Sequence, residues 1–199
     1  VLLNRAAQAD GRAVLDIGCG AGELALAIAR QQPEAQVWGL DVSHDLIAVA
    51  RRRGELLHNL RFVEGDAASW TDPGFTPDLL ISRHGVMFFP DPVAAFAHLR
   101  AIAVPGARLL FSCFRAPAEN PWAAGLARLL DLPPPADPAA PGPFAFADPG
   151  RVEGILDDAG WREIALDPVD FAYIAGHGEN PVEDALNLFR RIGPAAPYL

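Results

Sequence analysis

The sequence predicts an α/β fold in which a mostly parallel sheet lies between two layers of helices. The first observation is a strict alternation of strand-like apolar runs and helical patterns from residue 1 to about 115. The second is that helix boundaries carry ordinary signals, with Pro33 ending one helix and Ser43 preceding the next. The third is a glycine cluster directly after the first apolar strand. Such a succession of strands and helices favours right-handed parallel crossovers.

The elements follow in order from the apolar pattern and its end signals. Strands are predicted over residues 13–17, 36–40, 60–63, 77–81, 107–114 and 161–175, the last with a kink at Asp167–Pro168. Helices are predicted over residues 1–9, 23–31, 43–53, 91–103, 121–131, 149–159 and 181–192. Pro92 stands in the first turn of one of these helices, where proline is favoured. The proline-rich stretch 133–143 predicts a surface loop, because proline excludes helix interiors and inner strands.

Composition excludes several classes of function. The 199 residues are 51% hydrophobic with a formal net charge of −9, which excludes a disordered chain and repels nucleic acid and anionic lipid. No apolar run is long enough to span a membrane. All 16 basic residues are arginine, which excludes mechanisms that need a lysine, such as a Schiff base. Cys19 and Cys113 lie in separate segments without metal-ligand spacing, so we expect a cytoplasmic protein with reduced thiols and no metal.

The most informative segment joins the first predicted strand to the helix that follows it. Asp16 is followed by Gly18, Cys19, Gly20 and Gly22. Glycines at this position permit positive φ and let the backbone approach a ligand at the carboxyl end of the strand. A dinucleotide fingerprint would need a further glycine at position 23, where Glu23 would instead repel a pyrophosphate. S-adenosylmethionine, which carries a sulfonium and an amino group, fits this acidic segment better.

Two further acids follow the next two strands. Asp41 ends the second strand, and its carboxylate can accept hydrogen bonds from both hydroxyls of a ribose. Asp66 comes just after the third strand, where a carboxylate can accept a hydrogen bond from an adenine amino group. Each acid alone is equally explained as a helix cap or a surface charge. Three acids at the ends of three consecutive strands indicate a shared binding edge.

Together these residues resemble the class I S-adenosylmethionine-dependent methyltransferases, in the small-molecule group that includes the ubiquinone and menaquinone methyltransferases. The resemblance covers residues 11–114 strongly and 144–175 more weakly. It implies a Rossmann-like three-layer sandwich with strand order 3-2-1-4-5-(7)-6, formed by a single domain over residues 1–199. The domain would comprise a cofactor-binding core (1–114), a substrate-side insertion (115–147), and a last helix, sixth strand and helical tail (148–199). The seventh strand of the family has no counterpart after residue 175, so we expect a chain trimmed at both ends.

The resemblance also implies a set of site residues. The cofactor would be held by Asp16, Gly18, Cys19, Gly20, Gly22, Asp41, Val42, Asp66, Ala67 and Arg83. For Arg83, contact with the cofactor or an acidic substrate and a salt bridge with a neighbouring acid both stay open. His84 is the candidate catalytic base, with plain packing as the alternative. Phe88, Trp122, Phe144 and Phe146 are candidates for a substrate pocket, with a core position as the alternative.

The expected function is transfer of a methyl group from S-adenosylmethionine to a small-molecule acceptor by in-line displacement, with S-adenosylhomocysteine as product. Neither a nucleic acid nor a membrane is expected as a partner, and an oligomer is compatible with the sequence. One alternative is a protein that binds the cofactor without catalysis and serves regulation or assembly. The other is a nicotinamide-dependent oxidoreductase, which Glu23 disfavours.

Overall fold

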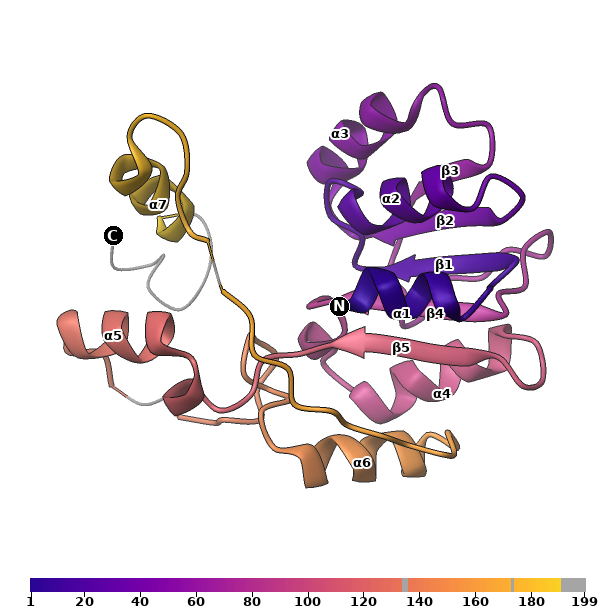
Figure 1. Ribbon diagram of the computed structural model, residues 1–199. Coiled ribbons are helices and arrows are strands. Elements are labelled where there is room, and N and C mark those ends of the chain that lie inside the picture. Colours follow the sequence, from indigo (N-terminus) through magenta and orange to yellow (C-terminus); the bar gives the residue numbers. More distant parts are fainter. Residues whose placement is uncertain (134–135, 173, 191–199) are drawn as a thin grey trace.

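A five-stranded parallel sheet organises the computed structural model, which describes residues 1–133, 136–172 and 174–190 (Figure 1). Its strand order is β3-β2-β1-β4-β5. The strands are β1 (Ala13–Ile17), β2 (Gln36–Asp41), β3 (Leu60–Glu64), β4 (Leu79–Arg83) and β5 (Arg108–Ser112). Every adjacent pair is parallel, which confirms the predicted α/β architecture and the order of the first five strands.

Helices cover both faces of this sheet. The helices are α1 (Leu2–Gln8), α2 (Glu23–Gln31), α3 (His44–Gly54), α4 (Pro92–Ile102), α5 (Pro121–Leu129), α6 (Pro149–Asp158) and α7 (Pro181–Phe189). Two short 3-10 turns, Val86–Phe88 and Pro117–Glu119, complete the described elements. The helices α1, α2 and α3 pack on one face of the sheet, and α4 and α6 on the other.

Alternation along the strands divides the core into two halves. Val14 and Val37 pack toward α1, α2 and α3, whereas Leu15 and Trp38 face α4 and α6. These side chains are all at most 5% exposed, as expected of parallel strands that helices cover on both sides.

Local signals explain where the helices begin. The hydroxyl of Ser43 accepts a hydrogen bond from the Leu46 amide at 3.3 Å, and the Asp91 carboxylate accepts one from Ala94 at 3.0 Å. Asp148 caps α6 in the same way through the amides of Gly150 and Arg151. Ser43 was the predicted cap of its helix, and the structure confirms it.

The boundaries of two predicted strands are corrected. The strand predicted over 77–81 is β4 at Leu79–Arg83, since Pro77 has no amide hydrogen to donate to a ladder. Asp78, just before β4, accepts hydrogen bonds from the amides of Arg12 and Ala13 and joins β4 to the start of β1. The strand predicted over 107–114 is shorter and ends at Ser112.

The predicted sixth strand is wrong for the described part of residues 161–175, which contains no strand. This segment is attached by side chains: the Trp161 indole donates to the Phe96 carbonyl at 3.0 Å, and Ile164 and Leu166 pack against the core. In the expected order a seventh strand separates strands five and six, and the described residues provide no such strand as a ladder partner. Pro168 also lacks an amide donor in mid-segment.

The C-terminal helices leave the sheet at one end. In Figure 1, α5 and α7 lie beyond the arrowheads of the strands, on the side of their carboxyl ends. The helix predicted over 181–192 is described as Pro181–Phe189, and residues 191 and 192 lie outside the described residues. Residues 134 and 135 of the predicted proline-rich loop also lie outside them.

We predict that Gly22→Ala destabilises the fold more than Gly106→Ala. Both glycines have positive φ, at +86° and +82°, so alanine costs about 1–2 kcal/mol of backbone strain at either position. A Cβ on Gly22 would also lie 2.6 Å from the Phe62 ring, whereas one on Gly106 would have no atom within 4 Å. Overpacking should add about 1–3 kcal/mol at Gly22 in urea unfolding. Equal losses in the two variants would contradict this steric account.

Candidate functional site

The carboxyl ends of β1, β2 and β3 bring the three predicted acids to one edge of the sheet. Asp16 lies in β1 opposite Gly39 of β2, and Asp41 ends β2 opposite Glu64 of β3. Asp66 follows β3 by two residues. Parallel register therefore turns three acids that are far apart in the sequence into neighbours along one edge.

Asp41 links the glycine-rich loop to the start of α3. One of its carboxylate oxygens accepts a hydrogen bond from the Gly20 amide at 2.8 Å, and the other accepts one from Ser43 at 2.9 Å. Each carboxylate oxygen has two lone pairs, so Asp41 retains capacity for two further donors. This is the capacity that two ribose hydroxyls would use.

Asp16 is a buried carboxyl group, and its exposed fraction is 1%. Burial raises the pKa of Asp16 to about 7, and the nearby negative charges of Asp41 and Glu23 push in the same direction. The Ala25 amide, which donates to Asp16 at 3.1 Å, and the Arg83 charge only partly offset this effect. A positive group bound at this edge would relieve the repulsion among these acids.

The loop between β1 and α2 leaves one backbone face open. Gly18, Gly20 and Gly22 all have positive φ. A Cβ on Gly18 would lie 2.9 Å from the Gly85 Cα, but one on Gly20 would meet no atom within 4 Å. The backbone at Gly20 is therefore the part of this loop that a ligand can approach.

Cys19 lies within this loop but turns into the protein. It is 7% exposed, and its Sγ lies 3.7 Å from the Gly20 carbonyl oxygen. Burial raises the pKa of the Cys19 thiol, so the group stays protonated and is a poor nucleophile. The thiol is therefore not a candidate nucleophile, and cofactor contact at Cys19 stays a prediction.

Residues after β2 and β3 provide the next part of the edge. The side chain of Val42, next to Asp41, is 69% exposed although it is apolar. Ala67 is buried beside Asp66, whose carboxylate accepts a hydrogen bond from the Ala68 amide at 2.9 Å. An exposed apolar side chain between two acids is suited to the face of a flat base.

Glu23 begins α2 and is held by two arginines. Its carboxylate lies 2.6 Å from the Arg53 guanidinium and 3.5 Å from that of Arg83. Burial tends to raise the pKa of Glu23, but the Arg53 hydrogen bond, the amide of Glu23 itself and the two positive charges together lower it. The salt-bridge alternative for Arg83 is thus observed, and its contact with a cofactor stays a prediction.

His84 follows β4 and is enclosed on one side. Its ring stacks on Phe114 with centroids 4.3 Å apart and planes at 4°, and its Nδ1 is buried without a hydrogen-bond partner. Burial, followed by the Arg83 charge, lowers the pKa of His84 to about 4. The imidazole is therefore neutral at physiological pH, the form that can accept a proton.

Ser82 is a site residue to which sequence analysis assigned no role. It is fully buried in β4, donates its hydroxyl to the Ile17 carbonyl at 2.7 Å, and accepts from the Gly85 amide at 3.2 Å. These bonds tie the end of β4 to the end of β1, beneath the glycine-rich loop. A serine inside an otherwise apolar strand was the signal that could have revealed it.

The candidate substrate residues separate into two groups. Trp122 and Phe144 stack on each other at 6.1 Å, and both lie about 6 Å from the Phe114 ring. Phe146 instead is 3% exposed and packs in the core against Phe96 and Phe111. Phe88 is 52% exposed, so it has a free face but no ring partner among those described.

Among residues 1–133, 136–172 and 174–190, no group of three His, Cys, Asp or Glu side chains could hold a metal ion. No helix within these ranges is both long and apolar enough to cross a membrane.

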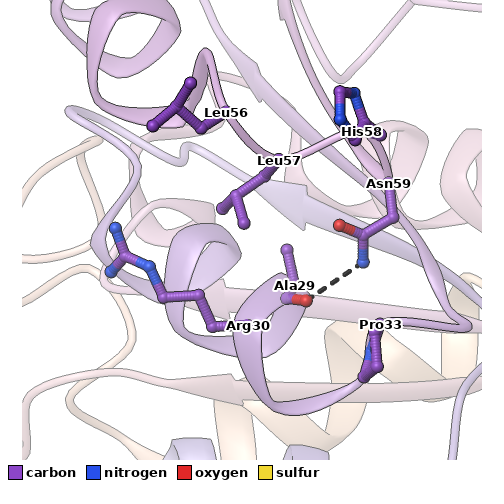
Figure 2. A pocket seen from close by; sticks show the side chains of 7 residues that line it. All are labelled: Ala29, Arg30, Pro33, Leu56, Leu57, His58 and Asn59. Carbon is purple, nitrogen blue, oxygen red and sulfur yellow. Dashed lines mark hydrogen bonds between the residues drawn. The ribbon is translucent and has the colours of Figure 1, made fainter.

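A surface hollow of about 360 Å³ lies at the opposite end of the sheet (Figure 2). It is formed by the end of α2 and the segment that leads into β3, and is lined by Ala29, Arg30, Pro33, Leu56, Leu57, His58 and Asn59. The Asn59 amide nitrogen lies within 3.1 Å of three backbone carbonyls, including that of Ala29. The Asn59 NH2 group is thus already hydrogen-bonded within the fold. The hollow is shallow and lies far from Asp16, Asp41 and Asp66.

Comparison with known families finds similarity to methyltransferases over this part of the chain. Residues 14–106 match the family model described as a methyltransferase domain. The chain is 34% identical over 137 residues to the trans-aconitate 2-methyltransferase of Methylobacterium radiotolerans, which covers 63% of this chain and 51% of that protein. It is 33% identical to the demethylmenaquinone methyltransferase of Thermus thermophilus, over 54% of this chain and 49% of that protein.

A further relative extends over most of the chain. The trans-aconitate 2-methyltransferase of Afipia carboxidovorans is 28% identical over 96% of this chain and 77% of its own length. Among solved structures, the YcgJ protein from Bacillus subtilis has a TM-score of 0.51 and 28% identity, over 65% of this chain and 56% of that one. The chain spans about half the length of the Methylobacterium and Thermus relatives.

We predict that Asp16→Asn removes part of the pH dependence of the free energy of unfolding. The folded-state pKa of Asp16 is about 7 and its ordinary value is 3.8, so folding takes up a proton between these pH values. The free energy of unfolding contributed by this group therefore falls as pH rises from about 4 to 7. Asparagine abolishes that fall and should raise stability at pH 8 by about 2–4 kcal/mol.

Urea unfolding of both proteins at pH 4, 6 and 8 measures this difference without a ligand. Parallel curves of stability against pH for wild type and Asp16→Asn would show that Asp16 is ionised throughout this range.

Proposed function

We propose that residues 14–106, which match a methyltransferase domain model, form a class I S-adenosylmethionine-dependent methyltransferase domain, and that the protein methylates a small-molecule acceptor. The observation that carries the proposal is the edge where Asp16, Asp41 and Asp66 meet beside the open backbone of Gly20. Trans-aconitate and demethylmenaquinone methyltransferases among the relatives support transfer to a small molecule.

The charge of this edge supports a positively charged cofactor. Asp16, Asp41 and Glu23 repel one another, and burial already raises the pKa of Asp16 to about 7. The sulfonium and amino group of S-adenosylmethionine would lower this cost, whereas the pyrophosphate of a nicotinamide cofactor would add to it. Because Arg53 and Arg83 neutralise part of the Glu23 charge, the negative charge at this edge lies mainly on Asp16 and Asp41.

Each part of the cofactor has a matching group on the protein. Asp41 would accept from the ribose hydroxyls, and Asp66 from the adenine amino group, with Val42 and Ala67 along the base. Asp16 would face the amino group of the methionine part. Arg83, at 3.5 Å from Glu23, has the weaker of the two ion pairs and is the arginine that could turn to the cofactor carboxylate.

The protein contributes alignment and exclusion of water. When bound, S-adenosylmethionine supplies an electrophilic methyl group on sulfur. Asp41 and the Gly20 amide hold the glycine loop in place, while Ser82 fixes the end of β4 beside it. His84, placed directly after β4, would accept a proton where the acceptor must lose one, and the burial that keeps it neutral by lowering its pKa to about 4 also makes it a weak base. Residues 115–147 would form the acceptor side.

We further propose that the protein works in the cytoplasm on soluble metabolites. The formal net charge of −9 opposes contact with nucleic acid. Both Cys19 and Cys113 are free thiols in the fold, as a reducing compartment would favour.

The proposal predicts that Asp41→Ala weakens binding of S-adenosylhomocysteine. Loss of two hydrogen bonds to a charged acceptor costs about 2–4 kcal/mol, which is about 30-fold or more in Kd by titration calorimetry. Asp78→Ala is the matched control, since Asp78 also accepts from backbone amides but at the far end of β1. Both variants should lose stability, but only Asp41→Ala should lose affinity. Unchanged affinity in Asp41→Ala would contradict the proposal that Asp41 binds the ribose hydroxyls.

A second prediction concerns His84→Phe, which keeps a ring on Phe114. If His84 accepts the acceptor proton, turnover measured by homocysteine release should fall by about 100-fold with cofactor affinity unchanged. Stability should change as well: the lowered pKa of His84 means that wild type loses stability as pH falls from 6.5 to 4, and phenylalanine flattens this loss. Wild-type turnover in the variant would reduce His84 to a packing residue.

A further inference from the structure

One fully buried hydroxyl joins two backbone segments beneath the glycine loop, the name we use for residues 18–22. It belongs to Ser82 of β4, which with Asp16 is one of two buried polar side chains in the part of the chain that the structure describes. The hydroxyl donates to the Ile17 carbonyl at 2.7 Å and accepts from the Gly85 amide at 3.2 Å. Removal of this hydroxyl would therefore take a buried partner from two backbone groups at once.

The Ile17 carbonyl lies where the ladder between β1 and β4 has ended. The last pair of that ladder is Asp16 with Ile81. Ile17 comes one residue later, directly before the glycine loop, and there the Ser82 side chain bonds to its carbonyl. On the other flank, the first two amides of the loop donate to the Leu40 carbonyl of β2 at 2.8 and 3.1 Å. Backbone bonds thus hold the β2 side of the loop, and a side chain holds its β4 side.

Gly85, the second partner of Ser82, lies in tight contact with the start of the same loop. A Cβ on Gly85 would be 2.7 Å from the Ile17 carbonyl oxygen and 3.0 Å from the Gly18 Cα. From the opposite side, a Cβ on Gly18 would be 2.9 Å from the Gly85 Cα. Only backbone fits between the two segments at this point. Because they are in direct contact, a shift of Gly85 displaces Gly18 as well.

The turn that carries Gly85 is itself fixed by the core and by β5. Val86 and Met87, which follow Gly85, are at most 1% exposed. His84, which precedes it, has a φ of +62°, and its amide donates to the Ser112 carbonyl at 3.1 Å. A positive φ is uncommon for a residue other than glycine and needs support from the surrounding structure. The turn therefore has one defined position, and the Ser82 hydroxyl links that position to the glycine loop.

We propose that Ser82 is a positioning residue, whose hydroxyl sets the position of the glycine loop and thereby the affinity of the site for S-adenosylmethionine and S-adenosylhomocysteine. The inference rests on the proposed binding of the cofactor at this edge. Asp41 holds the same loop further along, where its carboxylate accepts the Gly20 amide at 2.8 Å. Ser82 is fully buried and acts through the backbone of the loop.

Ser82→Ala tests the proposal against a matched control, Asn59→Ala. The side-chain amide of Asn59 also joins backbone groups, since it bonds to three carbonyls at and after the end of α2, but it lies at the opposite end of the sheet. Both variants should lower the free energy of unfolding in urea. Only Ser82→Ala should weaken binding of S-adenosylhomocysteine in titration calorimetry, by about tenfold or more in Kd. Affinity within about twofold of wild type in Ser82→Ala would overturn the proposal.

Two more variants separate positioning from a general loss of stability. Ser82→Thr keeps the hydroxyl and should bind S-adenosylhomocysteine within about threefold of wild type. Gly85→Ala, whose Cβ would press on the Ile17 carbonyl, should weaken binding by itself. Because Ser82→Ala and Gly85→Ala disturb one shared contact, the double variant should lose less affinity than the product of the two single losses. Losses that simply multiply would contradict a shared contact.

Hydrogen exchange of the ligand-free proteins tests the position of the loop without the proposed function. In Ser82→Ala the amides of residues 18–22 should exchange about tenfold faster than in wild type, while in Asn59→Ala they should stay within about threefold. If wild type does not bind S-adenosylhomocysteine, the proposed function fails. Faster exchange in Ser82→Ala would then still support the role of Ser82 in holding the loop, whereas unchanged exchange overturns that role.

Discussion

The carboxylate of Asp41 is the junction on which the binding edge depends. It accepts the amide of Gly20 from the glycine loop and the amide of Ser43 from the start of α3. Because Ser43 in turn caps α3, one side chain sets the position of a loop, a strand end and a helix start. Gly20 has positive φ, and its amide is bound to Asp41 while its other side is open. The proposed ligand site and the fold therefore share the same few hydrogen bonds.

Asp16 lies beside this junction and is buried with one hydrogen-bond donor among the described residues, the Ala25 amide. Its ionised form is therefore unfavourable in the folded protein. The raised pKa of Asp16 shows that the folded protein favours a proton there, with Asp41 and Glu23 adding to the cost. The ion pairs of Glu23 with Arg53 and Arg83 reduce the repulsion that comes from the Glu23 charge. A ligand with positive charge would offset this repulsion, and the sulfonium cofactor proposed for this edge carries such a charge.

The proposed acceptor side is built differently from the proposed cofactor edge. The proposed cofactor residues Asp16 and Asp41 lie at the ends of strands, where the ladder fixes them against their neighbours. The rings of Phe114, Trp122 and Phe189 come from loops and from helices outside the sheet, and they are positioned by contact with one another.

The sequence by itself determined the alternation of the first five strands with helices, the helix starts at Ser43 and Pro92, and the convergence of Asp16, Asp41 and Asp66. These features depend on signals within a few residues and on the rule that parallel strands end at one edge. The order of the five strands came from the resemblance to the methyltransferases. Only the tertiary structure decided that Arg83 pairs with Glu23, that His84 stacks on Phe114, and that Phe146 is in the core while Phe144 joins the rings. It also replaced the predicted sixth strand by a segment attached through side chains. The physical reason is that ion pairs, ring contacts and edge ladders join residues far apart in the chain, so packing rather than local pattern selects the partner.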